Sequence, residues 1–429
     1  MDWDILKKNV SRLRASQFWP PEQVTHAQGR LLATICSHAA EHVPFYAKTF
    51  ADPRIDDNGI IDPAWFRSRP ILLREHVQDC QDALTSRALH LEPAPPRPFE
   101  TAGSSGSPVR TLWSRHANTR LVAFESRLFE WMGVNPLDRC CSIYHTAHSE
   151  RPASRQPWYL GSDGPPASAK GMSTPVSELI DWLFEQQPAL LIGAPTIVRE
   201  LVTFSQETGT RIEGLNHVLT VGETMRDGFD QMVRDAWWSR LFDKYASREV
   251  GIMAVSCPDS PYMHIQAENT FVELLRDDGT PADDGETGSV IVTNLHNTAM
   301  PIIRYKIGDM AVAGPPCPCG RGLPTLRRIL GKERDMLTQP DGQKFFIFLN
   351  TNDITKRVPV RRFQVRQKTP TLVHLRYVTP EPLTQKQEAS LHTYLLDRLP
   401  EGMAVETHRC DDIPRLAKGK YRDIMSDVS

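Results

Sequence analysis

Residues 101–108 are the first segment whose composition suggests chemistry. They are Thr-Ala-Gly-Ser-Ser-Gly-Ser-Pro, in which small residues let backbone N–H groups approach an anion and four hydroxyls add donors. The segment lacks the Gly-x4-Gly-Lys spacing of a Walker A loop. It therefore predicts either a phosphate-binding loop of another kind or a flexible surface loop.

Two carboxylates stand where short elements are expected to end. Glu249 closes the segment that begins Asp243-Lys-Tyr-Ala, and a Glu beside hydroxyls can hold Mg²⁺ together with several waters. Asp309 follows Gly308 at the end of an apolar run, where a carboxylate can accept two ribose hydroxyls. The alternatives are a solvated helix start for Glu249 and a turn aspartate that satisfies its own backbone for Asp309.

A lysine near the chain end is the third candidate. Lys420 lies in Ala-Lys-Gly-Lys-Tyr-Arg, residues 417–422. A lysine on such a loop can reach a neighbouring cleft as a point charge. A solvated basic tail is the alternative.

Three cysteines and one histidine form two pairs that suit a metal. Cys317 and Cys319 flank a proline, while Cys257 and His264 lie upstream beside another proline. Three thiolates and one imidazole would complete a closed tetrahedral zinc site, so we expect structural zinc here. The spacings are not those of a zinc finger, and four unrelated loop residues are the alternative.

Composition excludes several classes of protein. The 429 residues include 50 Lys plus Arg and 52 Asp plus Glu, a net charge of −2, without the basic excess of a dedicated nucleic-acid or membrane binder. Apolar runs are far below the ~18 residues that a membrane span needs, and the N-terminus lacks the apolar core of a secretory signal. We expect a cytoplasmic protein with reduced thiols and no nucleic-acid or membrane partner.

Hydrophobic periodicity indicates the elements that must position these groups. Helical spacing predicts helices within 1–90 and over 116–132. Two more are expected, one capped by Thr174 with Pro175 in its first position and one after Pro195. Runs at 190–192 and 217–221 predict buried strands between them. Alternating helices and strands predict a mixed α/β sheet.

The later part of the chain changes character. Residues 269–275 and 289–295 predict an antiparallel hairpin region. Strands over 360–367 and 371–378 and a helix over 384–399 predict a small α+β domain after a boundary near 331.

The order of these motifs resembles that of the adenylate-forming superfamily, which includes acyl-CoA synthetases, peptide-synthetase adenylation domains and luciferases. The order is the hydroxyl-glycine loop, Gly222-Glu223, Tyr245-x-x-x-Glu249, Arg304-Tyr-x-x-Gly-Asp309 and a Gly-Lys near the end. Val43-Pro-Phe-Tyr46, Pro301-Ile-Ile-Arg-Tyr305 and Cys317-Pro-Cys-Gly-Arg-Gly-Leu-Pro324 resemble its phenylacetate–CoA ligase and coenzyme F390 synthetase branch. The likeness covers residues 40 to 424.

This resemblance implies an α/β fold with a large N-terminal adenylation domain of mixed sheets and helices over 1–330. A small α+β C-terminal lid over 331–429 would follow. It also implies a two-step ligase: a carboxylate, from an aromatic or other hydrophobic acid, attacks the α-phosphate of ATP, and a thiol then takes the acyl group. CoA is the expected acceptor; the alternative is an amine or a carrier-protein thiol. Homodimers are common in this branch.

The resemblance also assigns roles to residues of this chain. Those implied for ATP are Thr101, Ser104, Ser105, Gly106, Gly222, Glu223, Tyr245, Ala246, Asp309 and Lys332. Glu249 would hold Mg²⁺ and Lys420 would pair with phosphate and carboxylate oxygens, which with Tyr245 makes the catalytic set. Cys257, His264, Cys317 and Cys319 would hold the zinc ion.

Two arginines depart from the pattern of the superfamily. Arg248 stands where a hydroxyl is usual and would either stabilise pyrophosphate or pair with Glu249. Arg334 stands where the pivot aspartate of the hinge is usual. His145, His148 and the pair Trp158-Tyr159 would either line the acid pocket or lie in surface loops.

Overall fold

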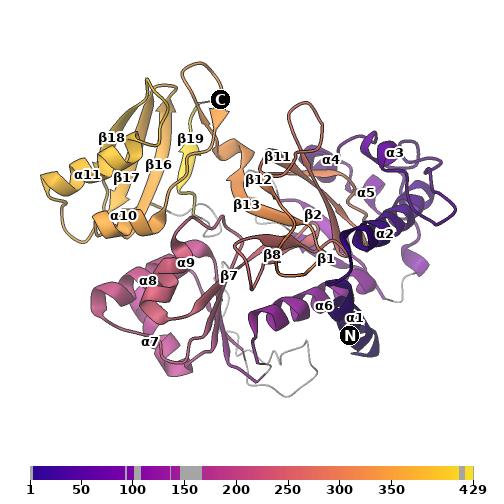
Figure 1. Cartoon of the computed structure of the whole chain (residues 1–429), viewed down its shortest axis with the longest axis horizontal. Helices are drawn as coiled ribbons and strands as arrows, with labels where there is room; N and C mark the ends of the chain where they lie inside the picture. Colours follow the sequence, from indigo (N-terminus) through magenta and orange to yellow (C-terminus); the bar gives the residue numbers. More distant parts are fainter. Residues whose placement is uncertain are drawn as a thin grey trace. The chain divides into compact units, whose positions relative to one another are not determined.

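The structure is a computed structural model that describes residues 3–91, 94–100, 108–135, 137–144, 167–414 and 421–428. These residues form two compact units (Figure 1). The first takes the described residues before 136 and those from 244 to 329. The second takes those from 137 to 243 and from 330 onward.

The first unit opens with helices and continues into an antiparallel sheet. Its helices are α1 (Trp3–Ser16), α2 (Pro21–His42), α3 (Pro63–Arg67), α4 (Arg74–Asp79), α5 (Gln81–Leu84), η1 (Leu89–Leu91) and α6 (Arg115–Met132). Its strands are β1 (Arg97–Glu100), β2 (Arg110–Trp113), β8 (Gly251–Ser256), β9 (Met263–Ile265), β10 (Thr270–Leu275), β11 (Thr287–Asn294) and β12 (Tyr305–Gly314). Two more, β7 (Arg240–Ser247) and β13 (Thr325–Lys332), cross the boundary between the units.

Most of these strands form one sheet with the order β10-β11-β12-β13-β9-β8-β7. The pairs β10–β11 and β11–β12 are antiparallel, as the hairpin pattern predicts. The predicted helix over 116–132 is α6: Ser114 accepts a hydrogen bond from the amide of Ala117 at its start, and Gly133, with a φ of 73°, ends it.

The second unit begins with parallel strands and the helices between them. The strands β3 (Cys140–Tyr144), β4 (Ser168–Gly171), β5 (Leu190–Gly193) and β6 (His217–Val221) pair in the order β6-β5-β3-β4. The helices are α7 (Val176–Gln186), α8 (Pro195–Thr208) and α9 (Phe229–Trp237). Pro175 precedes α7 instead of occupying its first position, so that predicted boundary is wrong by one residue. The predicted alternation of helices and strands is otherwise confirmed.

Residues from 330 onward form a smaller α+β arrangement. Its elements are η2 (Glu333–Asp335), β14 (Leu337–Thr338), β15 (Lys344–Phe345), α10 (Thr351–Arg357), β16 (Arg362–Thr369), β17 (Leu372–Val378), α11 (Gln385–Leu396), β18 (Ala404–Arg409) and β19 (Ile424–Ser426). The sheet order is β18-β17-β16-β19. Leu337, Val365, Leu375, Leu391 and Ile424 belong to a buried cluster made only of this segment.

The segment from 330 onward meets α8 and α9 within the second unit. Gly228 has a φ of 75°, and a Cβ added there would lie 2.2 Å from Oδ1 of Asn350. The amide of Thr351 donates to the carbonyl of Asp227 at 3.0 Å. Glycine is therefore required at 228 by both its conformation and the approach of Asn350.

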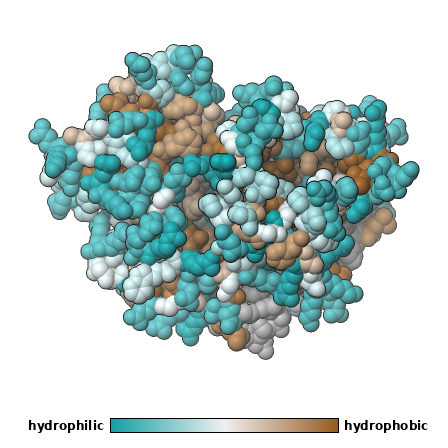
Figure 2. All heavy atoms as spheres, viewed as in Figure 1, coloured by the Kyte–Doolittle hydropathy of each residue, from teal (hydrophilic) through white to brown (hydrophobic). Residues whose placement is uncertain are grey.

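The predicted fold class is confirmed: the chain is α/β, with mixed sheets and a smaller α+β segment at its end. The domain limits 1–330 and 331–429 stay a prediction. Among the described residues, no helix is long and apolar enough to cross a membrane. The face in Figure 2 carries mostly hydrophilic side chains.

Candidate active site

Asp309 and Tyr245 form a hydrogen-bonded pair in the first unit. Pairing of β11 with β12 jumps from Ser289–Met310 to Ile291–Lys306, so residues 307–309 lie opposite Val290 alone. This bulge, with Gly308 at a φ of 80°, sets the direction of the buried Asp309 side chain. Its Oδ2 accepts a hydrogen bond of 2.8 Å from the Tyr245 hydroxyl.

Burial and the nearby carboxylates of Asp309 and Glu249 hold the pKa of Tyr245 well above its usual value. The phenol therefore stays protonated and donates its proton. The Tyr245 phenol, in β7, thus orients the Asp309 carboxyl group in the bulge of β12.

Glu249 is buried in the turn between β7 and β8. The indole of Trp113 donates to the carbonyl of Arg248 at 3.1 Å. A Cβ at Gly251, whose φ is 83°, would lie 2.9 Å from the Trp113 ring. The turn is thus tightly packed. The Arg248 guanidinium donates to the carbonyl of Glu100 at 2.6 Å, and its two predicted roles stay predictions.

Arg304 has a structural role that the sequence pattern did not reveal. It is buried, has a φ of 51°, and its Nε and Nη2 each donate to a carboxylate oxygen of Glu273 at 3.1 Å. It also donates to the carbonyls of Arg67 and Arg69. In the sequence, only the position of Glu273 among apolar residues of a predicted strand indicated that its carboxylate would need a buried partner.

Glu223 and Gly222 follow β6 in the second unit. One carboxylate oxygen of Glu223 accepts from the backbone and hydroxyl of Thr196, at 3.1 and 2.7 Å, at the start of α8. The other accepts from the amide of Tyr421 at 3.3 Å. Sequence reasoning missed Thr196 and Tyr421, although Tyr421 directly follows Lys420. Glu223 thereby connects the start of α8 to the backbone of Tyr421, the residue after Lys420.

A second contact holds the same C-terminal segment. Arg226 donates to both oxygens of Asp423, at 2.7 and 2.8 Å. Burial would raise the pKa of Asp423, but Arg226 lowers it overall. Nearby, Arg422 pairs with Asp335 in η2, and the predicted nucleotide residue Lys332 ends β13.

Several predicted residues lie outside the described ranges. They are Thr101, Ser104, Ser105 and Gly106 of the hydroxyl-glycine loop, Lys420, and the acid-pocket candidates His145, His148, Trp158 and Tyr159. Their predicted roles stay predictions.

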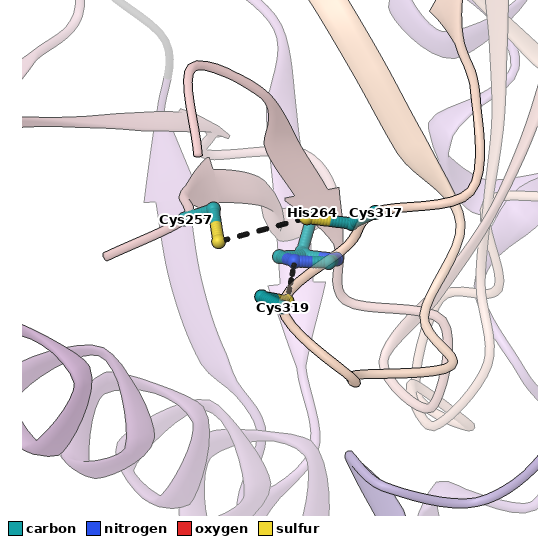
Figure 3. Close-up of side chains that lie close together, drawn as sticks. All are labelled: Cys257, His264, Cys317 and Cys319. Atoms are coloured by element: carbon teal, nitrogen blue, oxygen red, sulfur yellow. Dashed lines mark hydrogen bonds between the residues drawn. The ribbon is translucent and has the colours of Figure 1, made fainter. Parts of the chain in front are cut away.

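The four predicted zinc ligands do converge. Figure 3 shows their side chains pointing toward one another. Their ligand atoms all lie within 4.8 Å of each other, with Cys257 and Cys317 sulfurs 3.8 Å apart and His264 Nε2 3.2 Å from Cys319 Sγ. His264 Nδ1 lies 3.2 Å from the carbonyl of Leu323. Burial lowers the pKa of His264 to about 4, so the imidazole is neutral.

Comparison with known proteins shows which sequences and folds this chain is similar to. No family model matches the chain. Phenylacetate-coenzyme A ligase of Thermus thermophilus is 22% identical over 337 residues, covering 74% of this chain and 72% of the relative. The Escherichia coli enzyme of the same name is 24% identical over 338 residues, with the same coverage.

A solved structure covers nearly the whole chain. It is 2-hydroxyisobutyryl-CoA ligase in its postadenylation state with R3-HIB-AMP, with a TM-score of 0.74, 19% identity, and coverage of 96% of this chain and 91% of that one. The chain thus shares its fold with this ligase and is similar in sequence to the two phenylacetate-coenzyme A ligases. The same ligase with 2-HIB-AMP and CoA in the thioesterification state has a TM-score of 0.60 and 19% identity, and covers 97% of this chain and 92% of that one. The resemblance to adenylate-forming enzymes inferred from motif order is confirmed.

Proposed function

We propose that this adenylate-forming protein is a ligase that converts a carboxylic acid to an acyl-adenylate with ATP and then transfers the acyl group to CoA. The observation that carries the proposal is the buried Asp309 carboxylate, oriented by Tyr245 on a fold shared with acyl-CoA ligases. Its two curated relatives are CoA ligases, which favours CoA over an amine or a carrier-protein thiol as the acceptor. The acid is proposed to be aromatic or otherwise hydrophobic.

Asp309 is proposed to accept the ribose hydroxyls, because it is buried and already oriented by a phenol. Glu249 would hold Mg²⁺ in its packed turn. The Gly222-Glu223 turn, Tyr245 and Ala246 would border the adenine and the acyl carboxylate, and Lys332 would provide a positive group for the nucleotide. Residues 101–107 would bind the phosphates.

Lys420 is proposed to stabilise the negative charge that develops during attack on the α-phosphate. The support is local: the next residue, Tyr421, is held by Glu223, and Asp423 by Arg226. These contacts would restrict the backbone on the C-terminal side of the lysine.

Structural zinc is proposed at Cys257, His264, Cys317 and Cys319. Zinc bound at about 2.3 Å by thiolates in a tetrahedron separates two sulfurs by about 3.8 Å, the distance between Cys257 and Cys317. The amide of Asp259 donates to Cys257 Sγ at 3.4 Å, which suits a thiolate ligand. With four protein ligands, such a site has no open position for catalysis.

Pyrophosphate release from ATP with a panel of aryl and alkyl acids, with and without CoA, tests the function. We expect release that depends on one acid class and CoA thioester in matching amounts. The Lys420→Ala variant should lose adenylation, whereas Lys418→Ala should retain it. Acid-dependent acyl-AMP without thioester would show that the acceptor is not CoA, and no release with any acid would refute the ligase.

A further inference from the structure

The outer face of the C-terminal sheet carries two histidines and a glutamate that converge. In the parallel pair β17–β18, His374 lies opposite Glu406, and Arg376 lies opposite His408. Val373, Leu375 and Val405 alternate with them and belong to the buried core of this segment. Strand alternation therefore places His374, Glu406 and His408 together on the face away from that core.

The ligand atoms of these three residues meet at one carboxylate oxygen. His374 Nε2 lies 3.3 Å and His408 Nε2 lies 3.5 Å from Glu406 Oε2. The two imidazole rings are tilted by 49°, with their centres 4.5 Å apart. All three residues can thus offer one ligand atom to the same point, within 4.8 Å of one another.

These separations match those of a zinc coordination sphere. With ligand distances of about 2.0–2.1 Å, a tetrahedral zinc ion separates neighbouring nitrogen and oxygen ligands by about 3.3–3.4 Å. Two imidazoles and one carboxylate favour Zn²⁺ over Mg²⁺ or Ca²⁺, which prefer oxygen ligands. The side chains are partly exposed, with relative areas of 26% for His374, 55% for Glu406 and 44% for His408, so an ion can enter from solvent.

The surrounding charges do not prevent cation binding. On the neighbouring strand β16, Arg366 and Lys368 are both paired with Asp427, at 2.9 and 2.6 Å. Arg376, opposite His408, donates to the side-chain oxygen of Gln364 at 3.1 Å. An imidazole that binds a metal ion is neutral, so two such ligands and one carboxylate carry a net charge of −1, which complements a divalent ion.

We propose that His374, Glu406 and His408 form a second zinc site, on the outer face of β17 and β18, with water in the remaining coordination position. It is separate from the cluster of Cys257, His264, Cys317 and Cys319, contains no sulfur and is open to solvent. The proposal does not depend on the ligase activity.

Calorimetric titration of the full chain with Zn²⁺ tests this site. The protein is first stripped with a chelator, and native chain and variants are then titrated alike. Besides zinc bound by the cysteine cluster, we expect one equivalent whose affinity falls about tenfold or more in His408→Gln and in Glu406→Gln. Because both side chains are exposed, the variants should fold, and circular dichroism checks this.

Matched controls separate this site from other binding. His26 and Glu381 are also exposed, and the variants His26→Gln and Glu381→Gln should bind the same amount of zinc at this site with the same affinity. Cys319→Ser should keep it while disturbing the sulfur cluster. If Glu406→Gln and His408→Gln bind as much zinc as the native chain with the same affinity, or if only the event sensitive to Cys319→Ser is observed, the proposal is wrong.

Discussion

At the scale of single residues, the candidate site depends on buried polar groups with well-defined partners. Asp309 accepts a hydrogen bond from the Tyr245 hydroxyl. Arg304, which precedes Asp309 in the same part of the chain, forms a buried ion pair with Glu273. The first pair is proposed to serve the nucleotide and the second serves the fold. Two substitutions separate these roles.

Asp309→Asn should lower kcat/KM for ATP by about 10- to 100-fold, because a hydrogen bond to a charged acceptor contributes about 1.5–3 kcal/mol. If the lost partners are ribose hydroxyls, the native enzyme will discriminate against 2′,3′-dideoxy-ATP and the variant will not. Steady-state pyrophosphate release measures both. Asp341→Asn, in an exposed loop, is the control, and a variant that discriminates as well as the native enzyme would contradict the assignment.

Glu273→Gln should lower the free energy of unfolding by about 3–5 kcal/mol, because it leaves the buried Arg304 guanidinium without its anionic partner. Urea denaturation gives this value. The half-exposed Glu286, which pairs with Arg276, provides the control Glu286→Gln, which should change stability by less than about 1 kcal/mol. A similar small loss in both variants would show that the buried pair adds little.

At the scale of elements, contacts within the second unit hold the segment that follows Lys420. Arg226, after β6, binds Asp423, and Arg362 in β16 binds Glu200 in α8 at 2.8 Å. Tyr421 is buried and its hydroxyl donates to the carbonyl of Phe363. Each contact joins residues far apart in sequence.

Arg226→Ala should reduce acid-dependent pyrophosphate release by about tenfold or more, because it frees Asp423, three residues after Lys420. Arg234→Ala, which removes an exposed pair on α9, is the control. If lysine positioning is the cause, kcat falls more than the affinity for ATP changes. Equal activity in both variants would mean that the Arg226–Asp423 pair does not position the lysine.

The loop after β11 should make stability depend on pH through His296. Burial and the nearby Arg120 cation lower the pKa of His296 to about 3. Its Nε2 lies 2.6 Å from the carbonyl oxygen of Glu268. Above pH ~6.5 the imidazole is neutral in both states and has no effect. Between pH ~6.5 and 3 only the unfolded chain binds the proton, so stability falls by about 1.4 kcal/mol per pH unit.

His296→Gln, which can still donate to that carbonyl, should remove this slope. Urea denaturation of both chains at pH 7.5 and 5.5 measures it. The native chain should lose about 1.4 kcal/mol more than the variant over this interval. Parallel losses in the two chains would show that His296 is protonated in the native state.

At the scale of the whole molecule, the side chains of Cys257 and Cys317, 60 positions apart in the sequence, meet within the first unit. If Cys257, His264, Cys317 and Cys319 bind zinc, the binding free energy adds to folding. A strong chelator should then lower the melting temperature by about 5 °C or more, since about 2–4 °C corresponds to 1 kcal/mol in domains of 150–250 residues. Scanning calorimetry measures the shift.

The Cys319→Ser variant should melt at the same temperature as the native protein in chelator. Adding chelator to the variant should lower its melting temperature little further. Cys410→Ser, which removes a cysteine outside the cluster, should behave as the native chain. A native melting temperature that does not respond to chelator, with zinc absent from elemental analysis, would exclude structural zinc.

Most elements, and the chemistry of the candidate residues, could be predicted from the sequence without a structure. Helical and alternating periodicity are local properties, so α6, α8, β5, β6, β16 and β17 could be predicted from them. Motif order was enough to indicate an adenylate-forming protein. Cys257, His264, Cys317 and Cys319 could be grouped because thiols and imidazoles in paired loops suit one kind of ligand.

The tertiary structure alone decided which distant residues meet. The partners Glu223–Thr196, Arg226–Asp423, Arg304–Glu273 and His374–Glu406–His408 depend on strand register and on helix packing, which no local pattern encodes. The bulge that orients Asp309 is likewise a property of two paired strands. Burial then determines whether each charge is paired, shifted in pKa or available for binding, because desolvation depends on everything that surrounds the group.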